Sequence, residues 1–220
     1  MALRKAINMI PEAAIRWPTL QEQYLWASKV TAKEPLVGNK WGFVDGKNFR
    51  VEKPADANTQ NAMYNGWLHQ TLVTGTICFG ADGTIVWAKH NCPGSWNDGD
   101  TSRALQNKLS DPRFSPDPNM GILSDSAFPV LGAVKGKIVT PLKDGDLGRI
   151  HPSCRSAATA MSNAITSLRQ AAEWGMGAIE KPFERLLMKL PSNKFRRSIR
   201  LSNIFRLYNI RVRRTGISQI

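Results

Sequence analysis

The sequence predicts a mixed α/β domain built on a five-stranded sheet. Three stretches rich in aromatic and β-branched residues follow one another across short turns within residues 41–89. Two further apolar stretches, at residues 121–125 and 137–140, are separated from other elements by loops and segments of helical composition. A run of strands followed by strands that alternate with helices is typical of a mixed sheet flanked by helices.

Size and composition agree with one globular domain. The chain has 220 residues, of which 42% are hydrophobic and 21% charged. It contains no apolar run near the roughly 20 residues that span a bilayer, and its first residues do not form a secretory signal. We therefore expect an intracellular protein with no membrane partner. The three cysteines and three histidines are scattered, which argues against a disulfide framework or a zinc site.

The N-terminal part, residues 1–37, is predicted to be a helical lead-in. Pro11 and Pro18 interrupt it, and residues 20–30 have the composition of one helix. The amino-acid composition changes at residues 41–51, where aromatic and β-branched residues surround Asp45 and Gly46. This stretch predicts a strand that bends at Asp45-Gly46 and then continues.

The next elements form a predicted hairpin and then a helical half. Residues 67–79 and 84–89 are two strand-like runs joined by Gly-Ala-Asp-Gly, a sequence suited to a tight turn. A short helix is expected around residues 101–109. The strand at residues 121–125 ends at Asp125, and the strand at residues 137–140 is closed by a proline. Residues 156–179 then carry the strongest helical composition of the chain.

Positive charge is concentrated at the C-terminal end. The formal net charge is +13, and residues 181–220 hold eleven basic residues against one acid. A polyanionic partner would suit this balance, because cations placed on phosphates release condensed counterions. A solvated helix face would explain the charge alone equally well. The candidate DNA contacts are Arg169 and, mostly in a basic C-terminal segment at residues 191–220, Lys194, Arg196, Arg197, Arg200, Arg211, Arg213 and Arg214.

Three acids lie in settings that suit metal-dependent phosphoryl transfer. Asp45 lies in a predicted strand beside a glycine, Asp125 closes an apolar strand, and Glu173 lies in the long predicted helix. Two-metal catalysis needs carboxylates that converge on Mg²⁺ or Mn²⁺, which prefer oxygen ligands. Each acid also has an ordinary explanation, since strand-end aspartates form turns and helical glutamates are solvated. The spacing of the acids does not decide between the two.

The sequence motifs around these acids resemble those of PIF/Harbinger-type DDE transposases and of the nuclease-like proteins derived from them. Residues 42–47, Gly-Phe-Val-Asp-Gly-Lys, resemble the family's first catalytic block, and residues 122–129, Ile-Leu-Ser-Asp-Ser-Ala-Phe-Pro, resemble the second. Between them, residues 91–98 resemble its Pro-Gly-Ser-x-x-Asp loop. In residues 169–176 an Arg precedes a Glu by four positions, as in the third block.

The resemblance implies a fold, a reaction and a site. It implies an RNase H-like core at residues 38–190, with a mixed five-stranded sheet flanked by helices. It also implies a DDE-type nuclease in which Asp45, Asp125 and Glu173 hold two divalent ions, Mg²⁺ or Mn²⁺, and cut DNA. We accordingly expect DNA as a partner and the nucleus as the location. A separate DNA-binding partner protein and a homodimer are further expectations.

Several alternatives stay open at this stage. Glu180 and Glu184 lie seven and eleven positions after Glu173 and could take its place, although Pro182 interrupts the helix. Asp98 suits the N-cap of a helix better than a supporting place beside the metal.

The function also has alternatives. Only about 40 residues precede the core, too few for the family's usual DNA-binding domain, which suggests a truncated copy. The alternative function is therefore a catalytically inactive, transposon-derived DNA- or partner-binding protein. A basic structural protein of a ribonucleoprotein is a third, unrelated possibility.

Overall fold

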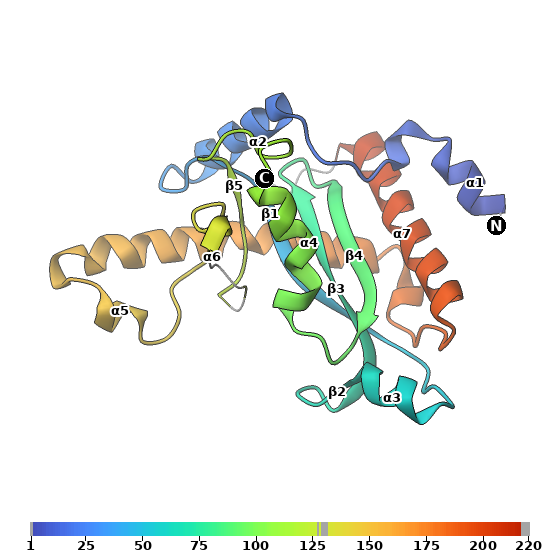
Figure 1. The fold of residues 1–220 in the computed structure, drawn as a ribbon. Coiled ribbons are helices and arrows are strands. Elements are labelled where there is room, and N and C mark those ends of the chain that lie inside the picture. The colour runs from blue at the N-terminus through green and yellow to red at the C-terminus, as the bar shows by residue number, and fades with distance from the viewer. Residues whose placement is uncertain (1, 127, 129–131, 217–220) are drawn as a thin grey trace.

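The computed structural model describes residues 2–126, 128 and 132–216 and contains one mixed sheet with helices on both faces (Figure 1). Its helices are α1 Ala2–Asn8, α2 Leu20–Lys33, α3 Ala57–Met63, α4 Asp98–Ser110, α5 Asp146–Arg149, α6 Arg155–Glu180 and α7 Lys194–Thr215. Short 3-10 turns lie at η1 Pro11–Ala13, η2 Gly132–Val134, η3 Pro152–Cys154 and η4 Glu184–Leu186. The strands are β1 Lys40–Arg50, β2 Tyr64–Asn65, β3 Gln70–Gly80, β4 Ile85–Pro93, β5 Gly121–Leu123 and β6 Ile138–Val139.

The sheet follows the predicted order of a meander and then crossovers, but with six strands rather than five. β1, β3 and β4 pair antiparallel, and β5 and β6 continue the sheet parallel to β1, so that the order is β4-β3-β1-β5-β6. The additional strand is β2, whose two residues pair with the first two residues of β3. A two-residue strand has no period that a sequence pattern can reveal.

The first long strand is continuous where a bend was expected. Asp45 pairs with Ile77 and Gly46 with Thr76 in an unbroken antiparallel register. The expected bend at Asp45-Gly46 is therefore wrong. A glycine after an aspartate often marks a turn, but here the long pairing partner β3 keeps the backbone extended.

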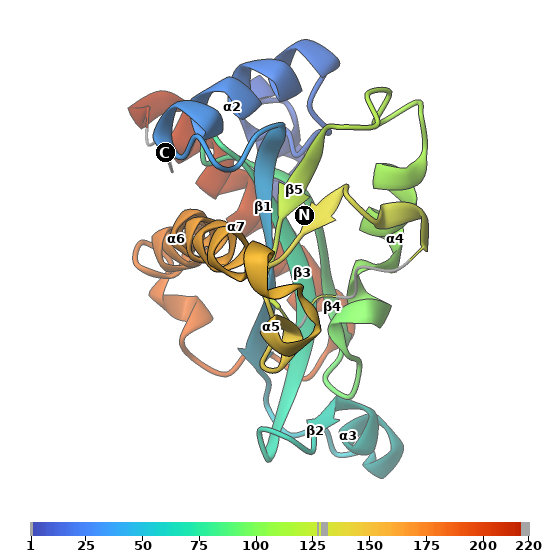
Figure 2. The same cartoon turned by 90° about the vertical axis from the view of Figure 1, so that its left-hand side faces the viewer.

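The two faces of the sheet are covered by different helices. α6 and α7 pack on one face and α4 on the other, as Figure 2 shows with the strands seen between them. α4 is fixed to its face by a buried hydrogen bond of 2.7 Å between the hydroxyls of Thr76 and Thr101. α2 packs at the start of β1, where the ring of Trp26 covers Gly80 and leaves no space for a side chain there.

The predicted helices at residues 20–30 and 156–179 are confirmed, with somewhat wider bounds. α2 begins with a capping box in which Thr19 and Glu22 bond to each other's backbone N–H groups. α6 runs for 26 residues and ends before Pro182, which cannot continue a helix. Gly175 lets α6 approach the sheet, because a Cβ there would lie 3.0 Å from the ring of Phe79.

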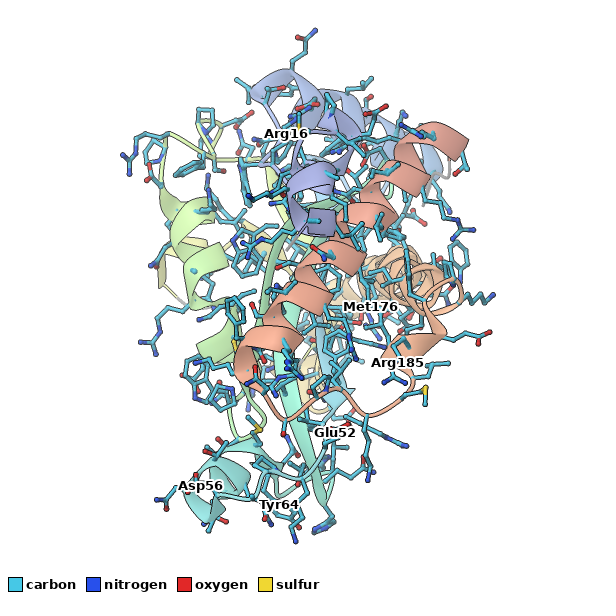
Figure 3. The ribbon with its side chains drawn as sticks, turned by 90° about the vertical axis from the view of Figure 1, so that its right-hand side faces the viewer. Arg16, Glu52, Asp56, Tyr64, Met176 and Arg185 are labelled. Atoms are coloured by element: carbon cyan, nitrogen blue, oxygen red, sulfur yellow. The ribbon has the colours of Figure 1, made fainter. Side chains whose placement is uncertain are left out.

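The basic C-terminal segment forms a helix that packs on the core. α7 lies along β4 and η1, and its side chains Leu201, Phe205, Tyr208 and Val212 are buried (Figures 1 and 3). The basic residues therefore lie on a structural element. Among the described residues, no helix is both long enough and apolar enough to cross a bilayer.

Asn209 joins α7 to the end of the sheet through three hydrogen bonds. Its side-chain amide accepts from the N–H of Ile85 at 2.8 Å and donates to the carbonyls of Ile85 at 2.8 Å and of Ala14 at 3.0 Å. The side chain is fully buried. A polar group that is buried with all its partners stabilises the fold, whereas partners left unpaired cost free energy.

We predict that Asn209→Ala lowers the free energy of unfolding by about 2–4 kcal/mol, because it removes the side-chain partner of the N–H and carbonyl of Ile85 and leaves the carbonyl of Ala14 with Arg213 alone. Denaturant titration followed by circular dichroism measures the change. Arg214→Ala, on an exposed position of the same helix, is the control and should change stability little. An Asn209→Ala protein as stable as the control would contradict this account.

Candidate active site

Asp45 lies in the middle of the central strand, on the face that α6 covers. Lys47, two residues further on and therefore on the same face, forms an ion pair of 2.7 Å with Glu180 of α6. Asp45 is partly buried, and its Oδ1 accepts a hydrogen bond of 2.8 Å from the N–H of Gly46. Burial raises the pKa of Asp45 to about 6, and the charges of Asp125 and Glu173 add to this.

Asp125 follows the strand next to β1 and lies level with Asp45. β5 runs parallel to β1 with Leu123 opposite Phe43. Asp125 and Asp45 each follow two residues later, so the two aspartates lie at the same level. The strand ends at Leu123, two residues before the predicted end. The Oδ1 of Asp125 accepts from the N–H of Phe128 at 3.1 Å, which holds the carboxylate in a turn after the strand.

Glu173 reaches the same region from α6. Its Oε1 accepts from Arg169 at 2.9 Å, one helical turn earlier, so that the two side chains form an ion pair on one helix face. The Glu173 side chain is 53% exposed. Both charges act on Asp45: Arg169 lowers its pKa and Glu173 raises it. The structure thus brings Asp45, Asp125, Glu173 and Arg169 within electrostatic range of one another.

The two alternative acids lie in other surroundings. Glu180 is held by Lys47, and Glu184 lies in the exposed turn η4 beyond the end of α6. Of these three glutamates, only Glu173 acts on the pKa of Asp45. The placement therefore favours Glu173 over both alternatives. The ion pair of Lys47 was not expected from the sequence, because its partner lies far away in the chain.

Asp98 is not the N-cap of a helix, which is the role that we predicted for it from the sequence. The N-cap of α4 is Asn97, whose side chain accepts from the N–H of Asp100 at 3.0 Å. Asp98 is the first residue of the helix, and its carboxylate lies beside Gly46, where a Cβ would be 2.9 Å from Oδ1. Since Gly46 and Asp45 point to opposite faces of β1, Asp98 approaches the strand from the side opposite Glu173.

The surroundings of Asp98 make it a fourth acid near this part of the sheet. Burial raises its pKa, and the charge of Asp125 raises it further. Asp125 therefore acts on acids at both faces of β1. The sequence singled out Asp98 as the acid of its Pro-Gly-Ser-x-x-Asp loop, but which acid it meets depends on how α4 packs.

The acids converge without forming a closed ligand set. Within residues 2–126, 128 and 132–216, no group of three or more Asp, Glu, His or Cys side chains is close enough to hold an ion as it stands. The carboxylate of Glu173 is instead paired with Arg169 at 2.9 Å. The donor chemistry is that of a hard cation, because all the converging groups are carboxylates.

The basic residues singled out from the sequence fall into two groups. Arg197 is 1% exposed and donates to Asn91 and to the carbonyls of Pro191 and Ser192, so its charge is directed into the fold. Arg213 donates to the carbonyls of Glu12 and Ala14. The other members, which are exposed or partly exposed, are Arg169, Lys194, Arg196, Arg200, Arg211 and Arg214.

Comparison with protein families supplies the decisive observation. The model of the DDE superfamily endonuclease family matches residues 44–209, about three quarters of the chain. The chain belongs to the DDE superfamily endonucleases. No curated protein and no solved structure matched it.

The family match extends over the whole cluster of acids. It begins at Val44, one residue before Asp45, and ends at Asn209 in α7. Asp98, Asp125 and Glu173 fall within it, whereas the last three arginines of α7 lie beyond it. DDE superfamily endonucleases cut DNA and generally use divalent metal ions, a chemistry that carboxylate ligands serve.

We predict that Asp45 lowers the stability of the metal-free protein at neutral pH. Its folded pKa of about 6 lies above the ordinary value of 3.8, so the folded protein binds more protons than the unfolded chain between these values. The free energy of unfolding therefore falls as pH rises through this window. Asp45→Asn should raise it by about 2 kcal/mol at neutral pH and should flatten the fall.

Denaturant unfolding in EDTA across the acidic to neutral range measures this effect. Asp144→Asn makes the same chemical change at an exposed residue and is the control. Equal pH profiles for wild type and Asp45→Asn would show that Asp45 is not desolvated as described.

Proposed function

We propose that the protein is a metal-dependent DNA endonuclease of the PIF/Harbinger type that carries out DDE phosphoryl transfer. Asp45, Asp125 and Glu173 are the proposed catalytic acids and ligands for two divalent ions, Mg²⁺ or Mn²⁺. The observation that carries the proposal is the convergence of these three acids within the region that matches the DDE superfamily endonucleases. We also propose that the protein is located in the nucleus. We further propose that it acts with a separate DNA-binding partner protein or as a homodimer.

The strand order supports an RNase H-like core. Apart from β2, the sheet has three antiparallel strands in sequence, followed by two strands parallel to the first, in the order β4-β3-β1-β5-β6. In this arrangement one acid lies on the central strand, one follows the adjacent parallel strand, and one lies on the helix over them. This is the arrangement that the resemblance to PIF/Harbinger proteins implies.

The donor set fits divalent ions in its chemistry and its charge. Asp45 is desolvated and lies within range of two other carboxylates, an arrangement that a bound cation would relieve. When bound, the ions activate the attacking oxygen and offset the negative charge that develops on the phosphate. Asp45 and Asp125 would hold them from adjacent strands, which fixes the positions of both carboxylates relative to each other.

Arg169 is proposed to hold Glu173 until the metal site is loaded. As it stands, the guanidinium neutralises the glutamate and keeps it on the helix face near Asp45. An exposed ion pair of this kind contributes little stability, so Glu173 can exchange Arg169 for a metal ligand position at small cost. Arg169 would then be free to face a phosphate of the DNA.

We predict that Asp125→Asn and Glu173→Gln each lower Mg²⁺-dependent nicking of supercoiled plasmid by about 100-fold or more, because each removes a ligand charge. Gel analysis of the nicked product over time measures the rate. Asp144→Asn and Glu184→Gln make the same chemical changes at exposed residues away from the acids and should leave the rate near that of wild type.

The outcomes separate the site from its alternatives. Full nicking by Asp125→Asn would overturn the assignment of the acids. Full nicking by Glu173→Gln together with loss in Glu180→Gln would transfer the third role to Glu180.

We also predict that Mn²⁺ raises the thermal unfolding midpoint of the wild-type protein by about 5 °C or more when its concentration exceeds Kd roughly 100-fold. Binding to the folded state alone produces this shift. Differential scanning fluorimetry in a Mn²⁺ series measures it, and Asp125→Asn should abolish most of it.

A second function is favoured by one observation, the pairing of Glu173 with Arg169 in place of an open ligand set. A catalytically inactive DNA- or partner-binding protein would have no need of metal. Salt-sensitive DNA binding by a wild-type protein that Mn²⁺ does not stabilise, and that does not nick plasmid, would support this function instead.

A further inference from the structure

A basic cavity lies at the far end of the strand that carries Asp45. It has a volume of about 350 Å³ and is lined by Arg50, Lys53, Lys189, Val51, Gln70 and Thr71. Three of these six residues are cations, and none is an acid. Glu52, which lies between Arg50 and Lys53 in sequence, marks this end of the molecule in Figure 3, opposite the end marked by Arg16.

The backbone fixes the three cations next to one another. Leu190 donates to the carbonyl of Arg50 at 2.8 Å and accepts from the N–H of Glu52 at 2.8 Å, so the chain after η4 continues the sheet at the end of β1. This pairing places Lys189 beside Arg50 although 139 positions separate them in the sequence. The cavity is therefore a product of the tertiary fold.

The three cations have no partner among the residues that the structure describes. Among the described residues, the side chains of Arg50, Lys53 and Lys189 form no ion pair or hydrogen bond, and all three residues are exposed. Lys47 and Arg169, by contrast, each have a carboxylate at 2.7–2.9 Å. Three uncompensated positive charges around one cavity repel each other, and an anion placed among them would relieve this repulsion.

We propose that this cavity binds the phosphate backbone of the DNA substrate at a distance from the cutting site. The proposal rests on the proposed function and adds the path of the DNA to it. Arg50 lies five residues beyond Asp45 on one continuous strand, roughly 17 Å away at about 3.3–3.4 Å per residue, and its side chain leaves the strand on the face opposite Asp45. One strand of B-DNA advances about 3.4 Å per phosphate.

The cavity thus holds a phosphate several nucleotides from the one that is cut, on DNA that passes around the end of β1. Cations that contact only phosphates position the DNA without reading its sequence. The cavity therefore sets where the DNA lies relative to Asp45. These three residues were not among the DNA contacts expected from the sequence, which lie mostly in α7.

The test compares two triple variants of the full chain. One replaces Arg50, Lys53 and Lys189 by Gln, and the matched control replaces Lys5, Lys29 and Lys143 by Gln. The control residues are exposed and lie outside the cavity, so both variants lose the same net charge. Fluorescence anisotropy with a labelled DNA duplex in EDTA, over a series of salt concentrations, measures Kd without cutting.

We expect the cavity variant to bind DNA about 10- to 100-fold more weakly than wild type at low salt. Its slope of log Kd against log salt should fall by about 2–3, roughly one for each lost phosphate contact. The control variant should lose much less on both measures. Thermal unfolding midpoints near that of wild type would show that both variants are folded.

Equal losses in the two variants, or no loss in the cavity variant, would overturn the proposal, as would a wild-type protein that does not bind DNA. The proposed catalytic site fails separately, through nicking by Asp125→Asn. A wild-type protein that binds through the cavity but does not nick would leave the cavity proposal standing and overturn the nuclease.

Discussion

The pairing of β1 on both edges is the constraint on which the site depends. β3 holds one edge in a long antiparallel register, and β5 holds the first part of the other edge in parallel. Because β5 stops at Leu123, the chain leaves the sheet level with Asp45 and carries Asp125 to it. The second half of β1 is then free on that edge for Leu190, which brings Lys189 to Arg50.

The negative charges of Asp125 and Glu173 around the partly buried Asp45 give the site its chemical character. Burial and the neighbouring carboxylates favour a protonated Asp45 at a pH where an ordinary aspartate is ionised. Arg169 offsets part of this repulsion through its pair with Glu173. The fold thus keeps an unfavourable concentration of acids, as expected where function rather than stability determines the residues.

The positive charge of the chain is divided between structure and surface. α7 uses Arg197 and Arg213 to bind backbone carbonyls, and its apolar side chains close the core over β4. Within the described part of the chain, the cations at the end of β1 have no such internal partners. A count of basic residues along the sequence gives both groups the same weight, although the charges of the first bind the fold itself and those of the second are exposed.

The sequence by itself determined the local elements and the setting of each acid. Runs of β-branched and aromatic residues predicted the strands, and alanine-rich composition predicted α6, because these preferences act over a few neighbouring residues. The motifs around Asp45, Asp125 and Glu173 indicated the DDE superfamily, which the family model then matched.

Only the tertiary structure decided how these parts meet. It paired Glu180 with Lys47, placed Asp98 against Gly46 on the opposite face of the strand, buried Arg197, and assembled the basic cavity from residues far apart in the chain. Each of these outcomes depends on how helices pack on a sheet, and packing is fixed by contacts between distant residues that no local pattern contains.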